Sequence, residues 1–395
     1  MKKILIVSAF LSAFCTAFSQ NTLTPLQQEG NAFYKEGKFA EAVESFNKEL
    51  VKNPTSLYSL NALGNIYYLQ NKFQQAYDVA DKGMKLSNGG PNFMTVKAKA
   101  AIKLNKAQEA VTMIDNYLLK QQPDFMILFI KGTALAALGD VQPALTAFSE
   151  SITANAEYPD VYFERGKAFA DIERYPQALK DYDKYISMAD DDADVYNYRG
   201  MIYYKTNKPD EAIADYTKCI QLNPKQKYAL TNRGIVYKDQ KQADKAFADF
   251  NAAIAIDPNY SDPYYQSADL CRNIKDFNKG LLFINKAIAL QPTYAYFYAM
   301  KSFIYFGIDN DNEALAAAEK SLQLLPKNHD AFLAKATALS NLSRFDEALT
   351  ALNLGISYLP DDYMLYGMRA SVHRFKGEMQ LAEADDLKAK QLAAK

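Results

Sequence analysis

The sequence is poor in the side chains that most often carry out chemistry in proteins. Its 395 residues include no tryptophan, two histidines and three cysteines. Cys15 falls in an N-terminal segment that we expect to be removed, and Cys219 and Cys271 alone cannot form a dense disulfide framework. We predict that both are buried free thiols. His329 and His373 lack partners at the spacing of metal ligands, so no metal site is predicted, and His373 is expected to pack in the core.

A strong charge of one sign is also missing, since 45 lysines and arginines stand against 46 aspartates and glutamates. Binding to a nucleic-acid backbone normally needs a basic face, so nucleic acid is not an expected partner. Gly89 and Gly90 form an isolated pair rather than a glycine-rich phosphate loop. We therefore predict no cofactor and no catalytic activity. An enzyme whose site is hidden among the many carboxylates is an alternative that stays open.

The N-terminus has the pattern of a secretory signal peptide. Lys2 and Lys3 precede an apolar run over residues 4–14, and Ala17 and Ser19 provide small residues for cleavage. The sequence predicts removal of residues 1–19, a short leader over residues 20–22, and an exported protein that is periplasmic or associated with the cell envelope. An uncleaved anchor is the alternative, although the run is shorter than the roughly 20 residues of a spanning helix. No integral membrane span is expected after cleavage.

The rest of the chain repeats at a fixed step of 34 residues without an insertion. Position eight of each unit is Gly, Ala or Ser, and position twenty is Ala or Gly, so two helices can approach closely. Bulky residues stand at positions four, eleven and twenty-four, and proline recurs at position thirty-two, where it ends a helix. Each unit is predicted to be a helical hairpin. The eleven units begin at Leu23, Leu57, Pro91, Phe125, Pro159, Ala193, Lys227, Ser261, Ala295, His329 and Tyr363.

These features resemble the tetratricopeptide repeat over residues 23–395. The resemblance implies a single all-α domain, a right-handed superhelical solenoid in which first helices line a concave groove. Position four departs from the family, because Tyr, Leu, Phe or Met replaces the frequent Trp. The third unit is irregular, with Ala101 and Ile114 at aromatic positions. In the last unit Asp386 replaces an aromatic residue, so this unit is expected to be a terminal cap.

Arginine at position seven and aspartate at position twenty-three occur together in four units and nowhere else in the register. We predict a charge-assisted contact between first and second helices, within one unit or between neighbours. A shared ancestry of the four units, with no contact, is the alternative. The four predicted pairs are Arg165 with Asp181, Arg199 with Asp215, Arg233 with Asp249, and Arg369 with Asp385.

Positions two, five, nine and twelve of each first helix form a second stripe, away from the hairpin core. The resemblance implies that this stripe faces the groove. Its aromatic residues in units seven to nine are the primary candidate binding surface, and unit four offers a smaller apolar patch of Met126 and Phe129. Packing between adjacent first helices is the alternative role for these rings. The primary surface consists of Tyr228, Tyr265, Tyr296, Phe303 and Phe306.

These observations favour a non-catalytic scaffold for protein–protein interaction that holds an extended peptide or a partner helix in its groove. A glycan or cell-wall binding module is the second hypothesis, because a tyrosine-rich groove could stack on sugar rings. The partner and the oligomeric state do not follow from the sequence, because a repeat architecture leaves recognition to variable side chains.

Overall fold

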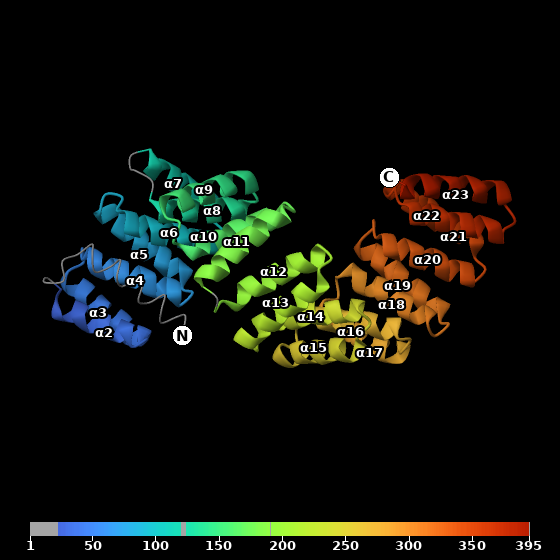
Figure 1. Ribbon diagram of the computed structural model, residues 1–395, viewed down its shortest axis with the longest axis horizontal. Helices are drawn as coiled ribbons and strands as arrows, with labels where there is room; N and C mark the ends of the chain where they lie inside the picture. Colours follow the sequence, from blue (N-terminus) through green and yellow to red (C-terminus); the bar gives the residue numbers. More distant parts are fainter. Residues whose placement is uncertain (1–22, 120–123, 190, 395) are drawn as a thin grey trace. The chain divides into compact units, whose positions relative to one another are not determined.

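The computed structural model describes residues 23–119, 124–189 and 191–394. The predicted signal peptide and the leader over residues 20–22 lie outside these residues. All 22 regular elements of the described chain are α-helices, which confirms the predicted all-α fold. Contacts divide the chain at Asp191 and Asp192 into an N-terminal body and a C-terminal body. In both bodies each helix lies against its neighbour in the chain (Figure 1).

The N-terminal body holds five helical hairpins. Three of their first helices begin with proline, a residue suited to the first helical position because its missing N–H has no partner there anyway. In chain order the helices are α2 (Pro25–Lys35), α3 (Phe39–Lys52), α4 (Leu57–Leu69), α5 (Phe73–Leu86), α6 (Pro91–Lys103), α7 (Ala107–Leu118), α8 (Phe125–Leu138), α9 (Val141–Ala154), α10 (Pro159–Asp171) and α11 (Tyr175–Met188).

The C-terminal body holds six hairpins. Most of their first helices begin at the first residue of a predicted unit, and α16 begins one residue later. In chain order the helices are α12 (Ala193–Lys205), α13 (Pro209–Leu222), α14 (Lys227–Asp239), α15 (Ala243–Ile256), α16 (Asp262–Asn273), α17 (Phe277–Leu290), α18 (Ala295–Phe306), α19 (Asp311–Leu324), α20 (His329–Asn341), α21 (Phe345–Tyr358), α22 (Tyr363–Phe375) and α23 (Met379–Ala393).

A close approach at position eight holds the two helices of a hairpin together. In five units the ring at position twenty-four lies directly on the glycine of the first helix. A Cβ atom added at Gly234 would stand 2.5 Å from Cε1 of Phe250, closer than any real contact allows. Phe250 is fully buried, so truncating it to alanine should cost about 3–5 kcal/mol. The small residues therefore admit the largest core rings.

The turn inside every hairpin has one conformation that sequence analysis did not foresee. Position fifteen has a positive φ in each of the described units, although glycine occupies it only at Gly37, Gly139 and Gly377. The next N–H then bonds to the carbonyl of position eleven, at 2.8 Å for Gln242 to Tyr237. This hydrogen bond closes the C-terminus of the first helix and turns the chain into the second.

The two described cysteines are buried, and His373 is largely buried. Cys219 and Cys271 are buried, as predicted, and burial raises their thiol pKa values to about 12 and about 11. His373 is largely enclosed and its Nδ1 lies 2.6 Å from a carboxylate oxygen of Glu378. The described residues contain no cluster of His, Cys, Asp and Glu suited to a metal ion. None of their helices combines the length and the apolarity needed to span a membrane.

Candidate functional site

An aromatic pocket opens beside the N-terminal ends of α16 and α18 in the C-terminal body. Its volume is about 260 Å³. Phe297 forms its buried side, because this ring belongs to the core between the two hairpins. Tyr294 and Tyr296 are 47% and 42% exposed, so they present ring surface to solvent. The residues that line this aromatic pocket are Asp262, Tyr265, Gln266, Tyr294, Tyr296 and Phe297.

The four rings of the aromatic pocket form a chain of contacts. The centroid of Tyr294 lies 5.5 Å from that of Tyr296 and 4.7 Å from that of Phe297. Phe297 in turn stacks on Tyr265 at 5.5 Å. The planes meet at 47°, 61° and 30° along the chain, so the rings offer faces in several directions. Such rigid rings supply contact area with little loss of conformational entropy.

Acidic groups surround the aromatic pocket. The hydroxyl of Tyr260 donates to Asp262 at 3.0 Å. Burial, together with the negative charges of Asp269 and Asp330, raises the pKa of Tyr265 to about 12. Burial also favours the protonated form of Asp269, but its bonds to Lys238 (2.6 Å) and Arg272 (2.7 Å) outweigh this effect and lower its pKa. The neighbouring basic groups are thus already engaged with Asp269.

The structure divides the five predicted aromatic residues among three places. Tyr265 and Tyr296 meet in the aromatic pocket, while Tyr228 pairs with Tyr260 at 5.3 Å. Phe303 and Phe306 contact each other at 6.2 Å, and both are partly buried. Phe306 also packs against the core of the tenth unit, so it has a structural role as well.

Tyr294 is the residue of the aromatic pocket that sequence analysis missed. It is the last residue of its unit and precedes α18, so it lies outside the stripe of positions two, five, nine and twelve. The signal that could have found it is the recurrence of tyrosine at position thirty-four, as Tyr158, Tyr260 and Tyr294.

The smaller patch predicted in unit four is only partly exposed. Phe129 lies 6.1 Å from Phe148 and 5.2 Å from Tyr158, between ring centroids. Burial is the main cause of the raised pKa of Tyr158. Met126 is likewise partly buried. Phe129 therefore contributes to packing between the fourth unit and the start of the fifth.

All four arginine–aspartate pairs form, each within its own unit and with two hydrogen bonds. Arg165 Nε and Nη2, for example, donate to Asp181 at 2.8 and 2.7 Å. The aspartate is buried in each case. The equivalent bonds join Arg199 to Asp215, Arg233 to Asp249, and Arg369 to Asp385.

The same basic position also reaches the preceding unit, at position twenty-five. Arg165 Nη1 donates to Ser149 at 3.1 Å, and Arg369 Nη1 donates to Asn353 at 2.6 Å. Lysines at position seven make the same connection in units without the aspartate. They are Lys97 with Asp81, Lys131 with Asp115, and Lys335 with Glu319. Position seven thus ties neighbouring hairpins as well as the two helices of one hairpin.

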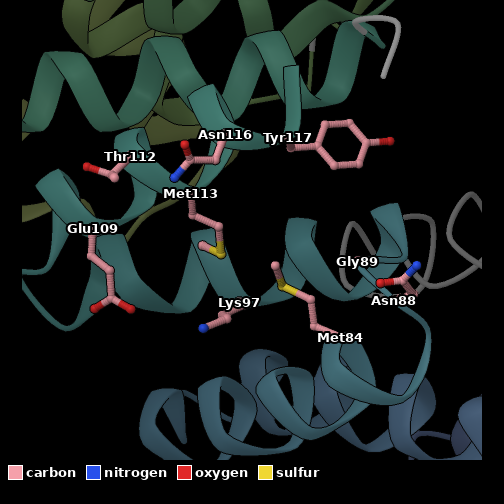
Figure 2. Close-up of a pocket in the computed structure, with 9 residues that line it drawn as sticks. All are labelled: Met84, Asn88, Gly89, Lys97, Glu109, Thr112, Met113, Asn116 and Tyr117. Carbon is pink, nitrogen blue, oxygen red and sulfur yellow. The ribbon is translucent and has the colours of Figure 1, made fainter. Parts of the chain in front are cut away.

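A second cavity, of about 490 Å³, lies between the second and third units of the N-terminal body. Met84 and Met113 extend toward each other across it (Figure 2). Its charged groups are already engaged, because Lys97 pairs with Asp81 and Glu109 accepts from Tyr77. Most of its lining comes from the irregular third unit, including Met113 and Tyr117. Sequence analysis did not predict this cavity.

Comparisons with protein families agree with this architecture. The model described as "Anaphase-promoting complex, cyclosome, subunit 3" matches residues 35–117. Models of the tetratricopeptide repeat match residues 95–161, 193–226 and 228–260. The chain therefore contains tetratricopeptide repeats, and its fold is of the corresponding helical-repeat type. No curated protein matches the sequence.

Solved structures support the fold. Yeast Tom70 is similar with a TM-score of 0.51 and 16% identity, over 93% of this chain and 91% of that chain. A tetratricopeptide repeat protein from Parabacteroides merdae has a TM-score of 0.51 and 17% identity, over 62% of this chain and 97% of that chain. At such identities the likeness concerns the fold alone.

Proposed function

We propose that this protein is a non-catalytic scaffold that binds an extended peptide or a partner helix along its first helices. Repeats of this type generally serve protein–protein interaction. The observation that carries the proposal is the aromatic pocket, where Tyr294 and Tyr296 expose nearly half of their surface beside the buried Phe297. Large exposed rings around a buried aromatic floor are typical anchoring points in protein interfaces.

The aromatic pocket is a better peptide site than the cavity between the second and third units. That cavity has one ring, Tyr117, and its lysine and glutamate already have partners. The aromatic pocket has four rings, two of them nearly half exposed. Aromatic side chains are enriched among the residues that dominate binding at protein interfaces, and this favours the aromatic pocket.

Export is part of the same proposal. The basic start, the short apolar run and the small residues at Ala17 and Ser19 support secretion followed by removal of residues 1–19. The partner would then be another protein of the cell envelope or the periplasm.

Selection from a random nonapeptide library on the mature chain tests the peptide-binding proposal. The enriched peptides are then titrated by fluorescence anisotropy against the Tyr294→Ala/Tyr296→Ala variant. Neither side chain caps its helix, so the variant should remain folded. We expect the variant to lose at least tenfold in affinity, whereas Tyr358→Ala, an exposed ring on α21, serves as the unchanged control. Binding to polysaccharide with no peptide enriched would instead favour the glycan hypothesis.

A further inference from the structure

We propose that the aromatic pocket binds a positively charged side chain, lysine or arginine, of the incoming peptide. This inference rests on the proposed function and specifies the chemistry that the aromatic pocket recognises. Three observations carry it: the arrangement of the rings, the sign of the nearby charge, and a cation that the chain itself places between two tyrosine rings one unit earlier.

The rings of the aromatic pocket are arranged as walls rather than as one flat surface. Consecutive centroids are 4.7 to 5.5 Å apart, and the planes of Tyr294 and Phe297 meet at 61°. A cation within about 6 Å of a ring centroid is attracted by the negative face of the ring. A group held between several such faces gains this attraction more than once. The rings therefore suit a compact cation.

The charge of the lining has the sign that a cation needs. Of the described residues that line the aromatic pocket, Asp262 is the one with a formal charge. The nearby cations Lys238 and Arg272 both bond to Asp269, while Asp330 adds a further negative charge near Tyr265. An incoming ammonium or guanidinium would therefore meet the carboxylate of Asp262, while Lys238 and Arg272 both pair with Asp269.

The preceding unit shows how this chain places a cation against two tyrosine rings, one of which, Tyr260, corresponds to Tyr294 of the aromatic pocket. Lys227 Nζ lies 5.1 Å from the ring centroid of Tyr228 and 4.9 Å from that of Tyr260. The same ammonium pairs with Asp257 at 2.5 Å. An aromatic pair, one carboxylate and one cation thus form a complete cluster within a single unit.

A step of 34 residues keeps one ring of this cluster, moves its carboxylate and removes its cation. Tyr260 becomes Tyr294, which keeps one ring, while Asp257 becomes Gln291 and loses its carboxylate. Tyr228 becomes Asp262, so a carboxylate stands where the second ring was. Lys227 becomes Ser261, a small and buried residue. The eighth unit therefore still has a ring and a carboxylate, Tyr294 and Asp262, but has no lysine at the position of Lys227. The bound peptide would supply it.

The size of the aromatic pocket agrees with a single side chain. Its 260 Å³ lies below the roughly 300–1,000 Å³ of pockets for drug-sized ligands. A lysine or arginine stem can lie along Tyr296 while its charged end reaches Asp262. The rest of the peptide would then lie outside the aromatic pocket, along the neighbouring first helices.

The test uses three labelled nonapeptides of glycine and serine that differ in the central residue: arginine, its uncharged isostere citrulline, or glutamate. Fluorescence anisotropy with the mature chain should show at least tenfold tighter binding of the arginine peptide. This preference should weaken at high salt, because part of it is electrostatic. Asp262→Asn should reduce binding of the arginine peptide about tenfold and leave the citrulline peptide unaffected.

A second variant tests the comparison with the preceding unit. Lys227→Ala removes the cation between Tyr228 and Tyr260, so the stoichiometry of the arginine peptide should rise from one to two. Equal binding of the three peptides, lost in the Tyr294→Ala/Tyr296→Ala variant, would overturn the cation proposal and leave the peptide scaffold standing. If selected peptides bind elsewhere, or no peptide binds, both proposals fail.

Discussion

Arg233 and Asp249 form a two-point contact, with guanidinium Nε and Nη2 each donating to one carboxylate oxygen at 2.8 Å. The remaining nitrogen, Nη1, donates to Thr217 of the preceding unit at 2.9 Å. The Asp249 side chain is 8% exposed, so its charge depends on this partner rather than on water. One arginine therefore joins the two helices of its hairpin and the hairpin before it.

Asp249→Ala should lower the free energy of unfolding of the C-terminal body by about 3 kcal/mol, because it leaves the guanidinium without its carboxylate in a mostly buried place. Replacing both partners, Arg233→Met with Asp249→Leu, should recover much of the loss. Urea unfolding followed by circular dichroism measures both effects. The exposed pair Arg344 and Glu347 is the control, and Glu347→Ala should change little. An equally small effect at Asp249 would contradict the role of the pair.

Lys241→Gly should stabilise the protein by about 1 kcal/mol. Lys241 has a φ of 60°, in which a β-carbon is strained, whereas glycine adopts this conformation freely. Asn207 occupies the same position of another turn with a φ of 56°. Because asparagine tolerates this conformation better, Asn207→Gly should gain less. Thermal unfolding of the two variants compares them, and a larger gain at Asn207 would contradict the explanation.

Lys99 should make the free energy of unfolding of the N-terminal body depend on pH in the alkaline range. Burial lowers the pKa of Lys99 from 10.5 to about 8, and the charge of Asp160 opposes this only in part. Between these pH values the unfolded chain holds a proton that the folded chain has released, so stability rises with pH across that window. Below about pH 8 the Lys99 side chain is charged in both the folded and the unfolded chain. The folded state then carries the full cost of burying this ammonium group.

Lys99→Met removes this titration. Relative to the variant, the natural sequence should become more stable from pH 8 to pH 10, as measured by urea unfolding at fixed ionic strength. Parallel stability curves for the two proteins would show that the Lys99 ammonium is solvated in the folded state.

The mature protein should begin at Gln20. Expression of the full chain in a bacterium with a periplasm, followed by fractionation and N-terminal sequencing, measures the cleavage point. Replacing Leu11 with arginine should interrupt the apolar run and retain the uncleaved chain in the cytoplasm. An intact N-terminus in the exported fraction would favour the anchor instead.

The hairpin architecture could be predicted because it depends on contacts that recur at fixed positions. Ala246 and Gly234 leave room for Phe250, and the same arrangement returns every 34 residues. The turn at position fifteen was missed because residue types such as Glu173 and Lys241 do not predict a positive φ. The geometry of the two packed helices imposes this conformation on them. Sequence analysis did not decide whether the residue at position seven also contacts the preceding unit. The acceptor in that unit varies, for example from Asp115 to Ser149, so no pattern indicates it.

The candidate site was harder to predict than the fold. Tyr265 and Tyr296 were found from helical periodicity, but Tyr294 precedes its helix and follows no such period. Phe306 lies on the expected stripe, yet it packs partly against the next core. The exposure of a ring depends on the size of its neighbours in adjacent units, which one repeat pattern does not specify.

Hydrogen–deuterium exchange of the mature chain, with and without the most strongly enriched nonapeptide, tests the central claim most directly. The account predicts slower exchange in the N-terminal turns of α16 and α18, around Asp262 and Tyr294, and no protection there in the Tyr294→Ala/Tyr296→Ala variant. Protection confined to another part of the chain, such as the cavity beside Met113, would contradict it.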